Sequence, residues 1–210
     1  MSSPARPVVV SPDVRRGGGA PASRTPPGQV LTRKWPVLHH GEVPSIHPAH
    51  WRLVVDGLVE HPLELGFEDL HRLPQVDLHC DIHCVTRWSR LDCTFTGVPI
   101  VRLLEMARPR PEARFVIQHA SSAPHDGWTT NLPLADLLVE DALLAWAEAG
   151  APLAPEHGAP VRAVVPRLYF WKGAKWIRRL ELVADDRPGF WERNGYHLRG
   201  DPWREERYAW

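Results

Sequence analysis

The stretch HCDIHCVTRWS, residues 79–89, places two cysteines and two histidines within six positions. So many metal-binding side chains raise three alternatives: a zinc site, a disulfide, or a single thiol with another role. From Val76 onward apolar and polar residues alternate with a period of two. This period predicts a β-strand with both cysteines on its apolar face and the histidines and aspartates on the opposite face.

Strand geometry argues against two of these alternatives. Histidines and cysteines on opposite faces do not converge on one metal ion. Cys80 and Cys84 lie about 13 Å apart along an extended chain, which is too far for a disulfide. What remains is one thiol at the end of the strand, Cys84, where it can reach a cavity. Core packing of Cys80, and equally of Cys84, stays open on the residues alone.

Composition limits the class of protein. The chain has 210 residues, 43% of them hydrophobic, which suffices for one core. Lysine plus arginine and aspartate plus glutamate both number 25, so the basic excess typical of nucleic-acid or acidic-membrane partners is missing. No apolar run is long enough to span a bilayer. Ten tryptophans are unusual, and such rings line ligand clefts as well as cores.

Two regions differ in composition. Residues 1–30 are rich in Pro, Gly, Ser and Arg without an apolar period, so we expect them to be disordered. Arg15-Arg16 is followed by glycines rather than by an apolar export segment, so we expect a cytoplasmic protein. Residues 31–210 are expected to form a single domain.

Within that domain we expect more strands than helices. A strand at 51–55 is followed by a hairpin turn at Asp56-Gly57 and a return strand from Leu58. Helices are expected at 67–73, after Pro99, and after Pro133 with Asn131 as a cap and Leu134, Leu137 and Leu138 inward. Further strands are expected at 114–119, 142–147, 161–165 and 175–183. The predicted fold class is α+β, mixed and β-rich with short helices.

Several motifs in the same order resemble one family. HCVTRWS (83–89) is followed by DGWTTNLPLADLL (126–138), HGAPVRAVVP (157–166), WKGAKWIRRLEL (171–182) and GFWERNGYHLRGDPW (189–203). This series resembles the molybdopterin-binding domain of the sulfite oxidase superfamily, and most closely its short bacterial oxidoreductases. The resemblance covers about residues 35–208 and implies the sulfite-oxidase-type fold.

The resemblance implies a molybdenum-molybdopterin cofactor whose metal is ligated by Cys84. A soft thiolate suits such a metal and needs no neighbouring cysteine. It also implies oxygen-atom transfer to or from a small substrate. Since a haem domain is missing from this chain, electrons are expected to pass to a separate partner, a haem protein or another carrier. Arg87 is the cation next to Cys84 in sequence, and we expect it to be catalytic.

The remaining site residues follow from the same resemblance. Arg162 and Lys175 are expected to hold the cofactor phosphate, because a guanidinium and an ammonium both donate to phosphate oxygens. The further cofactor-binding residues are expected to be Leu38, His39, His119, His157, Gly173 and Ala174. Two other functions stay open: a non-catalytic binding module of the same fold, and a zinc-binding protein.

Overall fold

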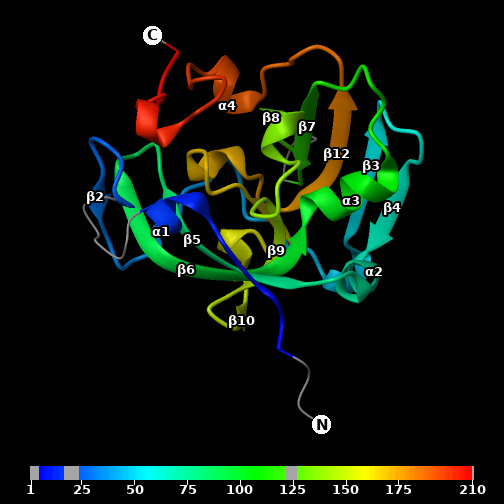
Figure 1. Cartoon of the computed structure of the whole chain (residues 1–210), viewed down its shortest axis with the longest axis horizontal. Helices are drawn as coiled ribbons and strands as arrows, with labels where there is room; N and C mark the ends of the chain where they lie inside the picture. The colour runs from blue at the N-terminus through cyan, green and yellow to red at the C-terminus, as the bar shows by residue number, and fades with distance from the viewer. Residues whose placement is uncertain (1–4, 17–23, 122–126, 210) are drawn as a thin grey trace.

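The computed structural model describes residues 5–16, 24–121 and 127–209. Within these ranges the chain forms two β-sheets and a few short helices (Figure 1). The α-helices are α1 (Pro12–Arg16), α2 (Phe67–Arg72), α3 (Ile100–Ala107) and α4 (Phe190–Arg193). The described part of the chain therefore has the expected α+β class, with the β-rich, short-helix character of the sulfite-oxidase-type fold.

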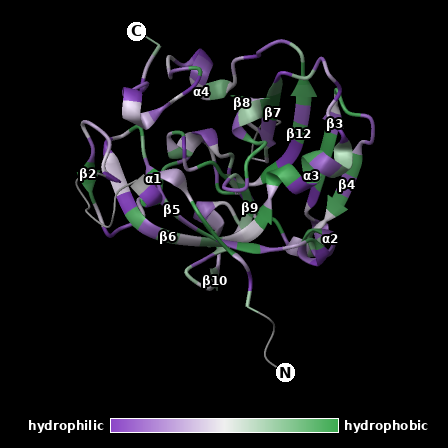
Figure 2. Cartoon of the chain, viewed as in Figure 1, coloured by the Kyte–Doolittle hydropathy of each residue, from purple (hydrophilic) through white to green (hydrophobic). Residues whose placement is uncertain are grey.

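One sheet has five strands in the order β4-β3-β12-β7-β8. Its strands are β3 (Arg52–Gly57), β4 (Leu63–Gly66), β7 (Phe115–Ala120), β8 (Thr129–Pro133) and β12 (Ile177–Val183). Hydrophobic and hydrophilic residues alternate along β12, so one face of the strand is buried (Figure 2). Helix α3 buries Ile100, Leu103, Leu104 and Ala107 in the same core, which confirms the helix predicted after Pro99.

The other sheet is built on a long antiparallel pair that runs across the lower part of the molecule in Figure 1. Its strands are β1 (Val8–Val10), β2 (Val30–Leu31), β5 (Val76–His83), β6 (Trp88–Pro99), β9 (Leu143–Glu148), β10 (Ala151–Pro152) and β11 (Arg162–Val164). Their order is β1-β5-β6-β9-β10, with β11 also paired to β9 and β2 to β6. Through this sheet, Cys84, which directly follows β5, and Arg162, which lies on β11, border the same cavity although they are distant in sequence.

The hairpin predicted after β3 is present, because β3 pairs antiparallel with β4, but its predicted turn is wrong. Strand β3 continues through Asp56-Gly57, and β4 starts only at Leu63. Gly57 has φ +83°, and a Cβ there would lie 2.2 Å from the carbonyl oxygen of Leu182. The glycine therefore permits close packing on β12 and does not form a two-residue turn.

The helix predicted after Pro133 is also shorter than expected. Only Leu134–Asp136 form a single 3-10 turn, and Leu138 is 48% exposed. Asn131 belongs to β8 and does not cap this turn. Its buried side chain instead accepts from the Lys172 ammonium at 3.1 Å. A buried polar partner thus takes priority over the local capping preference.

The described parts of residues 1–30 are not disordered. Strand β1 pairs in parallel with β5, from Val8 opposite Asp77 to Val10 opposite His79. Arg24 is 5% exposed and its guanidinium binds Asp81 at 2.5 and 2.8 Å. Backbone pairing and one buried ion pair order this segment although it has few apolar side chains. Residues 17–23 of the expected disordered segment lie outside the described residues.

The alternation along β5 also departs from its prediction at the end of the strand. Cys80 lies opposite Cys93 of β6, and the pairing register shifts between Cys80 and Ile82. Asp81 and His83, expected on the face opposite the cysteines, are both buried. The Arg24 guanidinium binds Asp81, and Nδ1 of His83 lies 2.8 Å from Oγ of Ser89. Cys80 and Cys84 lie in different hydrophobic clusters.

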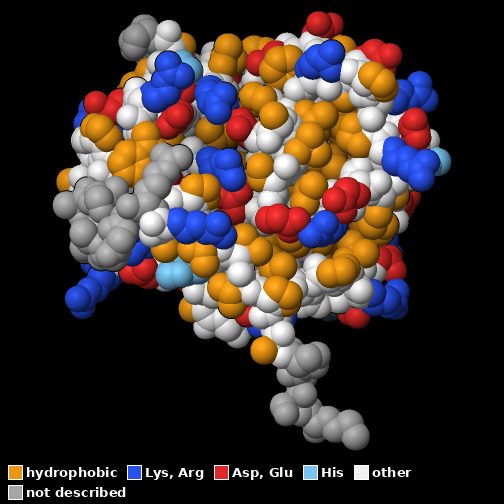
Figure 3. Space-filling model, in the orientation of Figure 1, with side chains coloured by type: hydrophobic (Ala, Val, Ile, Leu, Met, Phe, Trp, Pro, Cys, Tyr) orange, Lys and Arg blue, Asp and Glu red, His pale blue; other side chains and the backbone are white. Residues whose placement is uncertain are grey.

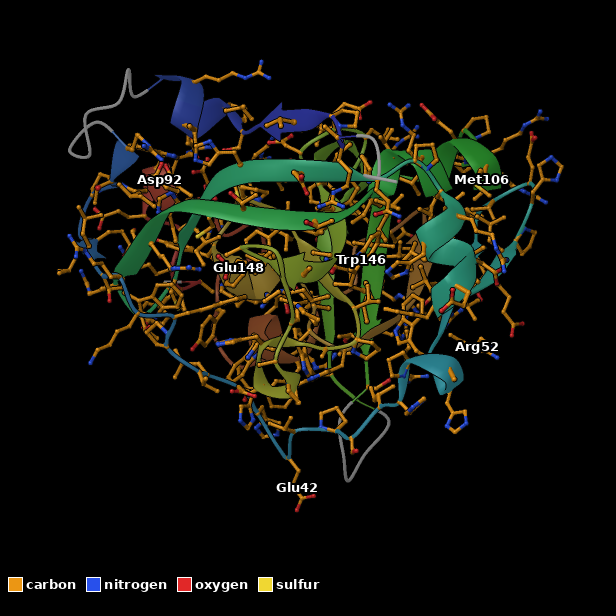
Figure 4. All side chains as sticks on the ribbon, turned by 90° about the horizontal axis from the view of Figure 1, so that it is seen from below. Glu42, Arg52, Asp92, Met106, Trp146 and Glu148 are labelled. Atoms are coloured by element: carbon orange, nitrogen blue, oxygen red, sulfur yellow. The ribbon has the colours of Figure 1, made fainter. Side chains whose placement is uncertain are left out.

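Positive and negative side chains are mixed over the face shown in Figure 3, in keeping with the zero net charge. None of the helices in the described ranges meets the length and hydrophobicity that a membrane span requires. Trp146 and Glu148 of β9 lie near the centre of the view in Figure 4, whereas Glu42 lies at the tip of a projecting loop. That loop, residues 34–47, borders the cavity described next.

Candidate active site

A cavity of about 900 Å³, counted with its open mouth, lies where the end of β5 meets β11 and the residues that follow it. Aromatic rings make up much of its wall, with six of the ten tryptophans: Trp35, Trp88, Trp128, Trp171, Trp176 and Trp191. Leu38, His39, Cys84, Arg162, Gly173 and Lys175, all predicted as site residues, line the same cavity.

Cys84 reaches the cavity because the chain makes a tight turn directly after β5. The Cys84 amide donates to the carbonyl of Trp88 at 2.8 Å, and the Arg87 amide donates to the carbonyl of Cys84 at 3.0 Å. The thiol is 7% exposed and its sulfur lies 3.1 Å from Oγ1 of Thr86. Burial raises the pKa of this thiol, while the Thr86 hydroxyl, Arg207 and Lys175 act to lower it. A bound cation would therefore favour the thiolate.

Arg162 is a buried cation without a carboxylate partner in the described ranges. It lies on β11 at 1% exposure, and its guanidinium donates to the carbonyls of Ala163, His157 and Gly173 at 3.2, 3.0 and 3.3 Å. Burial lowers the pKa of Arg162 to about 9. The guanidinium carbon lies 4.0 Å from the centre of the Phe170 ring. Since an uncompensated buried charge is costly, this position favours an anionic ligand.

Lys175 is a second cation of the same kind. Its ammonium donates to the carbonyl of Leu38 at 2.9 Å and to that of Glu156 at 2.7 Å. Burial, and then the charge of Arg162, lower its pKa to about 7. Two cations that repel one another and bond only backbone carbonyls form a site for an anion such as a phosphate.

Gly173 and Ala174 contribute to the site through their backbone packing and hydrogen bonding. A Cβ on Gly173 would lie 2.4 Å from the carbonyl oxygen of Ala163, so the glycine permits close packing on β11. Ala174 is fully buried and its amide donates to Oε1 of Gln118 at 3.0 Å. Ala174 is not among the residues that line the cavity, and its contact with the cofactor stays a prediction.

The predicted histidines are placed differently from one another. His39 lines the cavity, and its Nδ1 lies 3.0 Å from the carbonyl of Gly41. His157 stacks on Trp35, with ring centres 3.8 Å apart and planes 10° from parallel. Its buried Nδ1 has no partner among the described residues, and burial lowers its pKa to about 4. His157 thus supports a wall of the site and orients Arg162 through its carbonyl.

Two predicted site residues lie elsewhere. His119 is on β7 of the five-stranded sheet, where its Nε2 lies 2.9 Å from Glu181. Because side chains alternate along a strand, its neighbour Gln118 points to the site instead, bonding Lys172 and Ala174. Arg87 is exposed with φ 72°, and it too is not among the residues that line the cavity.

Sequence reasoning missed several contributors. Thr86 at the sulfur and Tyr196 on the cavity wall were not singled out, and the tryptophans were noted only as a group. Trp88 and Trp171 line the cavity, and their indole nitrogens are buried without a hydrogen-bond partner in the described ranges. They are free to donate to a ligand. The high tryptophan content was the one signal in the sequence that pointed to them.

Zinc finds no support in the described residues, where no three side chains of His, Cys, Asp or Glu come together as a metal site. The three cysteines are free and buried.

Comparisons with known proteins agree on the family. The sequence model of the oxidoreductase molybdopterin-binding domain matches residues 40–191. The chain is 52% identical over 190 residues to uncharacterized oxidoreductase YuiH of Bacillus subtilis, covering 90% of this chain and 94% of that protein. It is 31% identical over 163 residues to the protein-methionine-sulfoxide reductase catalytic subunit MsrP of Gluconobacter oxydans, covering 71% of this chain.

The fold is also similar to a solved structure, the sulfane dehydrogenase SoxCD of Paracoccus pantotrophus, with a TM-score of 0.62 and 28% identity over 70% of this chain. The chain spans 52% of the MsrP sequence and 41% of the SoxCD chain, so it corresponds to a part of each. The match to the family model, over most of the chain, identifies this protein as a member of the sulfite-oxidase-like family of molybdopterin-binding oxidoreductases.

Proposed function

We propose that this oxidoreductase transfers an oxygen atom to or from a small uncharged substrate and exchanges electrons with a separate redox partner. The observation that carries the proposal is the aromatic cavity around Cys84, whose two lining cations are both suited to the cofactor. The similarity to MsrP, a methionine-sulfoxide reductase by name, supports an uncharged oxide as the substrate class.

The residues present fit molybdopterin. Arg162 and Lys175 lie in the cavity without carboxylate partners in the described ranges and would hold the terminal phosphate. Cys84 offers a soft thiolate for the metal. The unpartnered indole nitrogens of Trp88 and Trp171 would donate to polar atoms of the pterin or the substrate. When bound, the cofactor supplies the two-electron metal chemistry of oxygen-atom transfer.

The chain itself positions the groups and excludes water. Backbone hydrogen bonds on both sides of Cys84 fix the direction of its sulfur. The Thr86 hydroxyl at 3.1 Å is placed to donate to the thiolate and so to withdraw charge from it. Rings from the loop at 34–47, from Trp171 and Trp191, and from Tyr196 enclose the space in front of the sulfur. A pocket walled largely by aromatic rings favours neutral over strongly hydrated substrates.

An anionic substrate such as sulfite needs cations of its own. Arg87, which was predicted to be catalytic, is not among the lining residues. Arg162 and Lys175 are assigned to the cofactor phosphate. Binding sulfite would therefore leave its charge without a counter-ion in a low-dielectric pocket. This argument supports an uncharged oxide and disfavours sulfite.

The test compares two substrates on the purified holoenzyme. Reduction of dimethyl sulfoxide with a reduced viologen dye as electron donor is expected to exceed sulfite oxidation with ferricyanide in kcat/KM by at least a hundredfold. A Cys84→Ala variant controls for reactions of the dyes alone. Efficient sulfite oxidation with no sulfoxide reduction would overturn the proposed substrate class.

The electron partner and compartment are proposed on the sequence argument. We propose a haem protein or another small carrier as the partner and the cytoplasm as the compartment. Cell fractionation and pull-down of the holoenzyme with candidate carriers test both.

A further inference from the structure

Two segments, one before and one after the region that matches the family model, contact the turn that carries Cys84. We define the cysteine loop as residues 84–88, the N-terminal strap as residues 24–31 and the C-terminal tail as residues 205–208. The strap and the tail lie outside residues 40–191, the range that matches the family model. Their contacts with the cysteine loop are therefore features of this chain that the family domain does not describe.

The strap binds the cysteine loop from one side. The side-chain amide of Gln29 donates to the carbonyl of Cys84 at 3.0 Å. The backbone amide of Val30 donates to the carbonyl of Arg87 at 2.9 Å, and β2 pairs with β6 at Trp88 and Ser89. The strap thus holds the carbonyl of the metal-ligand residue itself.

The tail binds the next residue through Arg207. This side chain is 4% exposed, and its two terminal nitrogens donate to different segments. One donates to the carbonyl of Val85 at 3.0 Å and the other to the carbonyl of Pro27 in the strap at 3.1 Å. Its guanidinium carbon lies 5.1 Å from the centre of the Tyr169 ring. A single buried cation therefore joins the cysteine loop, the strap and the tail.

We propose that Arg207 is a positioning residue that keeps the sulfur of Cys84 directed into the cavity, with Gln29 as a weaker support from the strap. This inference rests on the proposed role of Cys84 as the metal ligand. A functional side chain on a loop needs neighbours that fix it, since loops are otherwise the mobile parts of a fold. Arg207 and Gln29 fix two successive carbonyls, those of Val85 and Cys84.

The first test uses the metal-free protein. Cys80 and Cys93 are fully buried, so a thiol reagent such as dithionitrobenzoate reports mainly on Cys84 in the folded protein. Arg207→Met keeps an unbranched apolar stem but removes both hydrogen bonds, and we expect at least a tenfold faster reaction of Cys84. Arg207→Lys, which retains one donor, is expected to fall between. Arg204→Met, at an exposed neighbouring arginine, is the matched control.

The second test uses the holoenzyme and reads the ligand directly. Arg207→Met is expected to shift or broaden the thiolate-to-metal absorption band and to release molybdenum faster on dialysis, with Arg207→Lys restoring part of both. An unchanged thiol reaction rate together with an unchanged band would overturn the proposal. If Arg207→Met does not fold, Gln29→Met decides, because it removes one hydrogen bond: an unchanged Cys84 reaction rate in that variant would overturn it equally.

The thiol measurement needs no cofactor, so it separates this inference from the proposed function. If the protein binds no molybdenum but the Arg207 variant shows the faster Cys84 reaction, the positioning role of Arg207 stands and the proposed function fails. If oxygen-atom transfer is normal but Arg207 substitution changes neither the thiol reaction rate nor the absorption band, the proposed function stands and the positioning role of Arg207 fails.

Discussion

Arg162 and Lys172 are both buried cations, ten residues apart in sequence, but they differ in their hydrogen-bond partners. Lys172 donates to Glu192 at 2.7 Å, to Asn131 at 3.1 Å and to the carbonyl of Leu198 at 2.7 Å. Arg162 donates only to backbone carbonyls within the described ranges and lines the cavity. One positive charge is neutralised inside the protein, whereas the other faces a space that a ligand can enter.

The difference shows how to recognise a binding site among buried charges. Burial lowers the pKa of both side chains, but the carboxylate of Glu192 acts against that effect at Lys172. A buried ion pair that is complete belongs to the fold. A buried cation that lacks its anion has a cost that the apoprotein bears and that an anionic ligand removes.

The largest expected effect is on the stability of the metal-free protein. Lys172→Met leaves the Glu192 carboxylate buried and unpaired, which should cost about 3–5 kcal/mol of the free energy of unfolding. Arg162→Met removes a charge that has no carboxylate to abandon, so its cost should stay below about 1.5 kcal/mol. Urea unfolding of both apo variants checks this difference.

The double variant Lys172→Met, Glu192→Leu is the control, since it removes both charges and should recover part of the loss. Equal destabilisation by Lys172→Met and Arg162→Met would show that the two cations do not differ as described.

The next effect is on cofactor retention. Arg162→Met and Lys175→Met each remove a charged donor to the phosphate, worth about 1.5–3 kcal/mol, so cofactor should be released roughly ten- to a hundredfold more readily. Lys34→Met, at an exposed lysine of the neighbouring loop, is the control. Molybdenum per chain before and after dialysis measures it, and full retention by Arg162→Met would contradict the phosphate assignment.

The smallest effect concerns His157 beside Arg162. Its pKa is lowered to about 4 in the folded apoprotein, from 6.5, first by burial and then by Lys175 and Arg162. The unfolded chain therefore binds a proton between pH 6.5 and 4 that the folded chain does not, so stability falls as the pH falls through this window. Because the ring is half-buried, we expect about 1 kcal/mol or less from it.

His157→Gln should flatten the dependence of the unfolding free energy on pH between 6.5 and 4. His83, whose pKa burial also lowers to about 4, will leave part of the slope. Unfolding of the wild type and of His157→Gln at pH 7, 5.5 and 4.5 checks this, and identical slopes would count against the placement of His157.

Local sequence patterns predicted the elements in which apolar residues recur with a regular period. The period of two predicted β5, which ends directly before Cys84, and the spacing after Pro99 predicted α3. The hairpin itself was predicted correctly, but its two-residue turn at Asp56-Gly57 was not. The same dipeptide also suits a close approach between strands, and only the position of β12 distinguishes the two. The composition of residues 1–30 could not reveal a strand held mainly by backbone hydrogen bonds.

Site residues that lie in a sequence motif could be predicted. Site residues whose side-chain direction depends on the alternation along a β-strand could not. Cys84, Arg162 and Lys175 were placed in the cavity as expected. His119 was not, because it and Gln118 exchange faces with a shift of one residue along β7. Arg87 lies three residues after Cys84 in sequence, in the same turn, but it is exposed and is not among the residues that line the cavity.

The central claim is that Cys84 and not Cys80 holds the molybdenum, and paired serine variants test it most directly. Cys80 is fully buried opposite Cys93, so Cys80→Ser buries a hydroxyl and should cost about 1–3 kcal/mol while retaining the metal. Cys84→Ser replaces the soft ligand with an alcohol and should fold, yet lose the thiolate-to-metal absorption band and oxygen-atom transfer. The measurement is molybdenum content, visible spectrum and melting temperature of both variants. Loss of the band in Cys80→Ser with an unchanged band in Cys84→Ser would contradict the account.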